Sequence, residues 1–86
     1  MPEICRFYGI VIRMYANDHS PPHFHALYGE YEALMAIHDL EVLRGFLPAR
    51  ALRLVMEWAS LHQDELQEDW ERSRNLEPPL RIAPLE

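Results

Sequence analysis

The middle of the chain carries its clearest β-hairpin signal. Residues 23–28 and 31–37 each alternate in the manner of a strand, and they are joined by Gly29-Glu30. Glycine in the first position of a two-residue connection favours a type II′ turn, whose twist matches that of paired strands. This register sets Phe24 opposite Met35 on one face. Because side chains alternate along a strand, His23 and His25 must share the other face.

Around this hairpin we expect an α+β fold within one domain that spans residues 1–86. A small antiparallel sheet of three or four strands is followed by one long C-terminal helix packed on it and by an extended tail. The expected elements are strands at 5–15, 23–28, 31–37 and 42–47, a helix at 48–74 and a tail at 75–86. Pro48 suits the first turn of a helix, where its missing N–H is not needed.

The predicted helix is long and apolar around much of its circumference. At a rise of about 1.5 Å per residue it would extend about 40 Å, beyond the roughly 25–30 Å of a compact domain of this size. Besides the stripe that faces the sheet, Leu54, Trp58 and Leu61 lie on a second apolar stripe. One sheet cannot cover both stripes, so we expect this second stripe to bind a second copy of the chain or a small partner protein.

Composition indicates the cellular compartment in which the protein is expected to work. Of its 86 residues 49% are apolar, and Cys5, the only cysteine, cannot form an internal disulfide. No run approaches the ~18 apolar residues of a membrane-spanning helix. Strand-like sequence begins almost at once, without a secretory leader. These features predict a cytoplasmic protein that does not associate with a membrane.

Charge disfavours a general nucleic-acid-binding role. The chain has a formal net charge of −6, contains no lysine, and carries its whole negative excess after residue 28. Affinity for nucleic acids depends on neutralising phosphates, so an acidic chain is a poor general binder. A phosphate could still be bound at a local site near Arg6 and Arg13.

Three of the five histidines, His19, His23 and His25, fall within seven residues. Imidazole is the commonest protein ligand for transition metals. His23 and His25 project from the same strand face, His19 could join them from the preceding loop, and Asp18 or His62 could add a fourth ligand. Three histidine ligands would leave one position open at zinc, as catalytic sites do. Zinc or nickel is therefore the expected metal.

Two other interpretations of these histidines stay open. His23 and His25 could act as base and acid on a phosphodiester, with Arg13 stabilising the developing charge. Alternatively, the rings only brace the loop through hydrogen bonds to carbonyls or carboxylates. The first interpretation predicts a hydrolase and the second a non-catalytic adaptor.

The same motif carries a resemblance to a known family. Asn17-Asp18-His19 is followed by Pro22-His23-Phe24-His25-Ala26, and further matching segments lie at 6–12, 28–29, 47–50 and 61–63. Together they resemble the domain-of-unknown-function family 4160, over nearly the whole chain. The resemblance implies a small bacterial protein, of a kind often encoded beside a second small uncharacterised domain. Such pairing is similar to that of toxin–antitoxin or regulatory modules.

These observations favour one component of a two-protein, toxin–antitoxin-like module. Its working site would be His19, His23 and His25, assisted by Arg13 and Asp18. A metal-binding protein or hydrolase that acts alone is the first alternative, and an adaptor without catalytic activity is the second.

Overall fold

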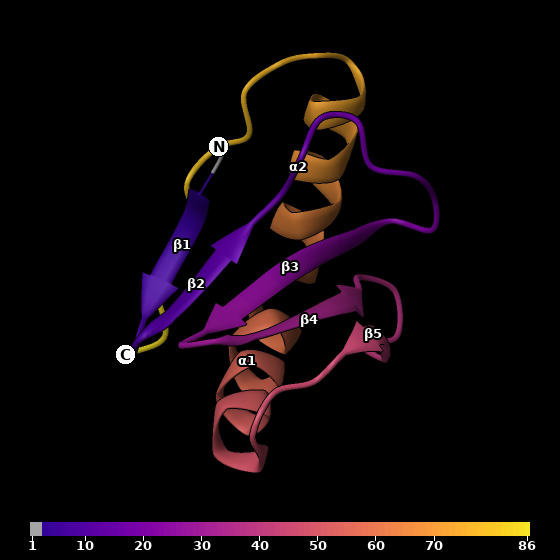
Figure 1. Ribbon diagram of the computed structural model, residues 1–86. Helices are drawn as coiled ribbons and strands as arrows, with labels where there is room; N and C mark the ends of the chain where they lie inside the picture. Colours follow the sequence, from indigo (N-terminus) through magenta and orange to yellow (C-terminus); the bar gives the residue numbers. More distant parts are fainter. Residues whose placement is uncertain (1–2) are drawn as a thin grey trace.

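The computed structural model describes residues 3–86; positions 1 and 2 of the predicted domain lie outside this range. The fold is α+β, with a five-stranded antiparallel sheet followed by two helices (Figure 1). The elements are β1 (Glu3–Phe7), β2 (Ile10–Arg13), β3 (His23–Tyr28), β4 (Tyr31–Ala36), β5 (Val42–Gly45), α1 (Ala49–Leu61) and α2 (Gln63–Arg74). The strands lie in the sheet in chain order.

Both helices lie on one face of the sheet, and the opposite face carries no helix (Figure 1). The core forms between the helices and the sheet. Its largest fully buried side chains include Trp58 from α1, Leu66 from α2 and Phe24 from β3. Cys5 is also buried there, and burial raises the pKa of its thiol, which agrees with a structural role.

No helix within residues 3–86 is both long enough and apolar enough to cross a membrane.

The central hairpin confirms the predicted register. Phe24 pairs with Met35, and Tyr28 pairs with Tyr31 on either side of the turn. Gly29 has a positive φ of 57°, as the first central residue of a type II′ turn requires. His23 and His25 therefore lie on the face opposite to Phe24.

The prediction of one continuous strand over residues 5–15 is wrong. The segment folds into a second hairpin, with Phe7 paired to Ile10 across a two-residue turn. Both turn residues have a positive φ, 50° at Tyr8 and 80° at Gly9, which is the type I′ geometry of tight hairpins. This extra turn accounts for the sheet having five strands instead of three or four.

The prediction of one long helix is also wrong, because the helix breaks at His62. His62 leaves helical geometry with φ −131° and ψ 25°. The next side chain, Gln63, donates to the carbonyl oxygens of Ile37 and His38 at 2.8 and 3.1 Å and so ties the break to the end of β4. Asp64 and Glu65 then occupy the first turn of α2, where negative charge is favourable. Two short helices fit a molecule with extents of 33 × 26 × 23 Å, which a helix of about 40 Å would exceed.

One residue of the helix stripe that was expected to bind a partner is buried in the core and contacts the C-terminal tail. Trp58 is fully buried, and its indole N–H donates to the carbonyl oxygen of Ala83 at 2.8 Å. Leu54 is half-buried against the core, whereas Leu61 is 68% exposed. The expectation of an uncovered stripe through Leu54, Trp58 and Leu61 is therefore wrong for Trp58, because the chain supplies its own cover.

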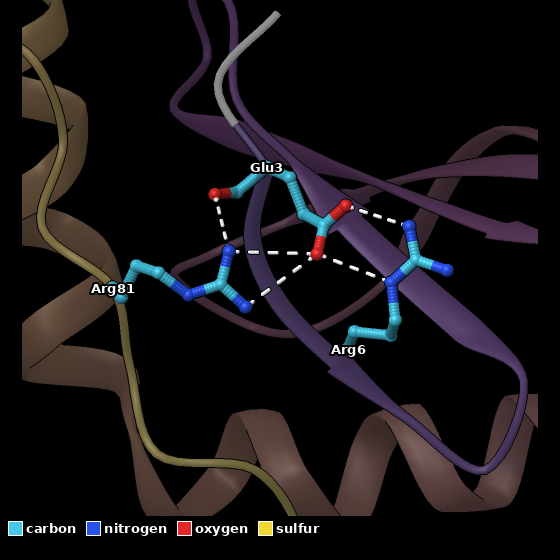
Figure 2. Close-up of polar contacts among 3 residues, drawn as sticks. All are labelled: Glu3, Arg6 and Arg81. Atoms are coloured by element: carbon cyan, nitrogen blue, oxygen red, sulfur yellow. Dashed lines mark hydrogen bonds and ion pairs between the residues drawn. The ribbon is translucent and has the colours of Figure 1, made fainter.

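The tail is also fastened to β1. The Ile82 N–H donates to the carbonyl oxygen of Ile4 at 2.9 Å. Beside this bond, Glu3 lies between two guanidinium groups: Arg6 donates to it at 2.8 Å, and Arg81 of the tail approaches to 3.4 Å (Figure 2). The hydrogen bond from Arg6 is the main cause that holds the pKa of the Glu3 carboxyl below its ordinary value. The tail thus protects the β1 edge of the sheet, while β5 forms the opposite edge.

Candidate metal site

Three polar side chains converge on the helix-free face of the sheet. Asp18, His23 and His25 each offer one ligand atom, and these atoms lie within 4.8 Å of one another. The two histidines come from alternate positions of β3, so their rings point to the same side. Asp18 comes from the loop between β2 and β3, which passes the end of α2 before it reaches the start of β3 (Figure 1).

The His23 ring is fixed in one orientation and leaves one nitrogen free. Its Nδ1 lies 2.8 Å from the carbonyl oxygen of Pro21. A carbonyl oxygen can only accept, so Nδ1 carries the proton and donates. Nε2 is completely buried and has no hydrogen-bond partner among the described residues; the Asp18 carboxylate lies 3.2 Å away without forming a hydrogen bond. His23 therefore directs Nε2 toward Asp18 and the interior of the site.

His25 stands between two carboxylates. Its Nε2 lies 2.8 Å from Asp18 Oδ2, and its Nδ1 lies 2.9 Å from Glu32 Oε2. Without a metal, both contacts are hydrogen bonds only when both ring nitrogens carry protons. With a metal at Nε2, Asp18 would become a ligand and Glu32 would accept from Nδ1–H. A carboxylate that orients a ligating histidine in this way is common at metal sites.

Aromatic rings exclude solvent from the two histidines. The edge of the Tyr15 ring lies against His25, with a centroid distance of 4.6 Å. The Trp70 ring of α2 lies 5.3 Å from the His23 ring. Only 6% of His23 and 9% of His25 is exposed, and α2 contributes to this cover through Trp70. Such enclosure raises the cost of an unpaired polar atom and strengthens any interaction with a charged ligand.

The other residues of the predicted site take different places. His19 is exposed and lies outside the converging group, so a three-histidine cluster does not form within residues 3–86. Arg13 lies directly opposite His25 in the β2–β3 register and is half-buried. His62, considered as a fourth ligand, contacts Glu65 at the helix break instead.

Sequence reasoning missed Glu32. In the hairpin register His25 pairs with Leu34, so Glu32 is its diagonal neighbour on the same face of the sheet. Diagonal neighbours on paired strands are within reach of long side chains. The signal was therefore present in the predicted hairpin register.

The arrangement suits a divalent transition metal. Two imidazole nitrogens and one carboxylate oxygen form a donor set used for zinc and for non-haem iron. Three protein ligands leave at least one coordination position free for a small molecule. Asp18, His23 and His25 could hold such an ion, and the unpartnered nitrogen of His23 fits this donor set.

Fold and site together define a small α+β protein with a possible metal site on the open face of a five-stranded meander. Residues 9–71 match the family model described as Domain of unknown function (DUF4160), so the chain belongs to that family. No curated protein and no solved structure matches the chain. Membership confirms the resemblance seen in the histidine motif, and the family's description assigns no activity.

Proposed function

We propose that this protein binds a divalent transition metal, zinc or nickel, through Asp18, His23 and His25. The buried, unpartnered Nε2 of His23 carries the proposal. A buried polar atom without a partner costs on the order of 1–3 kcal/mol, a cost that a folded protein normally avoids. A metal ion would satisfy this atom and would also bring together the two other ligands within reach of it.

The rival interpretation, in which the histidines only brace the loop, explains part of the geometry. The hydrogen bond from His23 to Pro21 and the two contacts of His25 would all serve that purpose. It leaves His23 Nε2, which forms no hydrogen bond with the described residues, without a role. Metal binding accounts for all of these contacts with one ion.

Metal content tests this proposal directly. Untagged protein offered zinc or nickel and then desalted should hold about one equivalent by elemental analysis, and the His23→Ala variant should hold none. The His38→Ala variant is the matched control, since His38 is exposed and lies outside the group. His19→Ala should also keep the metal; its loss there would favour the three-histidine set. Absence of metal from the wild-type protein would refute the proposal.

We further propose that the protein is one component of a two-protein, toxin–antitoxin-like or regulatory module. Family resemblance suggests the pairing, and exposed apolar side chains at one sheet edge give a partner a surface. Phe46 is 62% exposed beside Tyr31, and Val42 and Leu43 of β5 are more than 40% exposed. Unpaired edge strands readily accept another chain.

Co-expression tests the module. The chain is expressed alone and together with the adjacent open reading frame of its source genome, and growth and co-purification are followed. Phe46→Glu should abolish a complex, whereas His25→Ala should leave it intact. Normal growth in both cultures, without a complex, would contradict the module.

A further inference from the structure

A pocket of about 370 Å³ opens beside the candidate metal site. Asp18 and His23 form part of its wall, so the pocket and the metal site share two side chains. Ser20 and Pro21 of the loop that carries Asp18 also line the pocket. The rest of the wall brings together two kinds of residue: His19 and Arg44, and the apolar side chains of Leu34 and Leu43. A small molecule in this pocket would therefore touch the metal position, a guanidinium group and an apolar surface.

The sheet register explains how Arg44 reaches the site. His25 of β3 pairs with Leu34 of β4, and Leu34 pairs with Arg44 of β5. On the other side His25 pairs with Arg13 of β2. Directly paired residues point to the same face of a sheet, so these four side chains form one row across it. The buried histidine thus has an arginine on either side along the row.

Arg44 is available for a ligand. No ion pair or hydrogen bond joins its guanidinium to another of residues 3–86, and the side chain is exposed. Elsewhere in the described part of the chain, Arg6, Arg72 and Arg81 are all engaged by carboxylates. A guanidinium presents parallel N–H donors that match the oxygens of a phosphate or carboxylate, and such paired contacts are among the stronger hydrogen bonds.

We propose that this pocket binds the oxyanion group, phosphate or carboxylate, of a small organic molecule, with Arg44 as an anion-binding residue. The proposal rests on the proposed metal site, which would contact the same oxyanion from the Asp18 and His23 side. Leu34 and Leu43 would contact the organic part of the molecule. His19, expected as a metal ligand, takes the role of a second polar contact in the pocket wall.

Size and charge favour a small ligand over a nucleic acid. A pocket of about 370 Å³ is of the size that holds a small molecule. The chain as a whole carries a net charge of −6 and would repel a long polyanion. A single oxyanion in the pocket would meet Arg44 of the wall and the proposed metal, which would offset the charge of Asp18. Arg13 lies on the other side of His25 in the cross-strand row, outside the pocket wall, so Arg44 is the arginine that a ligand would contact.

Calorimetric titration of the zinc-loaded protein with phenyl phosphate tests the inference. Arg44→Gln should weaken binding about 10-fold or more, because it removes a charge-assisted pair of hydrogen bonds. Arg44→Lys should recover part of the lost affinity, since it keeps the positive charge but lacks the paired N–H donors of the guanidinium. Arg53→Gln is the matched control: it removes the same charge from an exposed position on α1 and should bind as the wild type does.

Metal content measured on the same samples separates the two proposals. If zinc is retained and phenyl phosphate binds Arg44→Gln as tightly as wild type, the pocket assignment is overturned and the metal site stands. If no sample holds zinc, the proposed metal site is refuted, and the titration is interpreted on the metal-free protein. Binding of phenyl phosphate that depends on Arg44 would then still support the pocket assignment. Absence of such binding would refute both proposals.

Two further ligands define the chemistry of the pocket. Benzoate in place of phenyl phosphate distinguishes a carboxylate site from a phosphate site, and either result with Arg44 dependence supports an oxyanion pocket. A short single-stranded RNA that binds more tightly than both small anions, in an Arg44-dependent manner, would overturn the assignment to a small molecule.

Discussion

The two faces of β3 bury neighbouring residues by different means. Phe24 points toward the helices and packs against Trp58, with ring centroids 6.0 Å apart, in an apolar core. His25, the next residue, points to the helix-free face and is nearly as well buried, by Tyr15 and by the loop that carries Asp18. Burial of apolar surface stabilises a fold, whereas burial of polar groups costs free energy unless they are paired.

This difference assigns separate tasks to the two faces. The helix-covered face supplies the stability of the domain. The other face holds two imidazoles and a carboxylate in a fixed arrangement that is partly shielded from solvent, and burial of these polar groups lowers the stability of the domain. Groups that a protein buries at such a cost are candidates for function. Substitutions on the two faces should therefore have different consequences.

The largest effect should come from the helix-covered face. Trp58→Ala should lower the free energy of unfolding by roughly 3–5 kcal/mol, because it leaves a large cavity and removes the bond to Ala83. Urea denaturation measures this change. Met56→Ala, at a position that is 41% exposed on the same helix, should cost much less. Equal losses for the two variants would show that the tail does not seal a core around Trp58.

The next effect should come from the open face and should appear in ligand affinity. Glu32→Gln should weaken zinc binding about 10-fold or more, because the amide orients the His25 ring less well than a carboxylate does. Competition with a chromogenic chelator measures the zinc affinity. Glu30→Gln, in the exposed turn of the same hairpin, is the control. An unchanged affinity in Glu32→Gln would make Glu32 an ordinary surface carboxylate.

Much of the open face could be predicted from sequence because it depends on local pairing. Alternation and the Gly29 turn specify the hairpin register, and this register alone places His23 and His25 together. Arg44 could not be placed in this way. Its position depends on the pairing of β4 with β5, and that pairing contains an irregularity between Leu34 and Met35 that the alternation of residues does not reveal.

The two wrong element predictions have different causes. The Tyr8-Gly9 turn left a local signal, a glycine between two short alternating segments, which the longer alternating pattern obscured. The break at His62 has almost no local sequence signal, because no proline or glycine marks it. It depends on Gln63 reaching backbone carbonyls 25 and 26 residues away, which is a tertiary contact.

The smallest effect concerns a buried carboxyl on the helix side of the molecule. Asp69 of α2 is 2% exposed; one oxygen accepts from the Leu80 N–H at 2.8 Å, and the other has no partner among the described residues. Burial is the main cause that raises the pKa of Asp69 above its ordinary value of 3.8. Unlike Asp18, it has no histidine beside it, and its one bond holds the tail.

A raised carboxyl pKa means that the folded state binds the proton more tightly than the unfolded state does. The resulting stability is fully present below the unfolded pKa, near 3.8, and is lost as the pH rises through the folded pKa. Asp69→Asn should remove this loss, so its stability relative to wild type should increase as the pH rises from about 4 toward neutrality. Urea denaturation midpoints across that range measure the trend.

Glu71→Gln, at an exposed position on the same helix, is the control: its urea denaturation midpoint should change with pH in the same way as that of the wild type. If the midpoint of Asp69→Asn also followed that of the wild type across this pH range, Asp69 would not be desolvated in the folded protein. The expected divergence would show that a buried carboxylate here carries a cost with no ligand to offset it. That result would sharpen the contrast with Asp18, which has two histidine nitrogens within 3.2 Å.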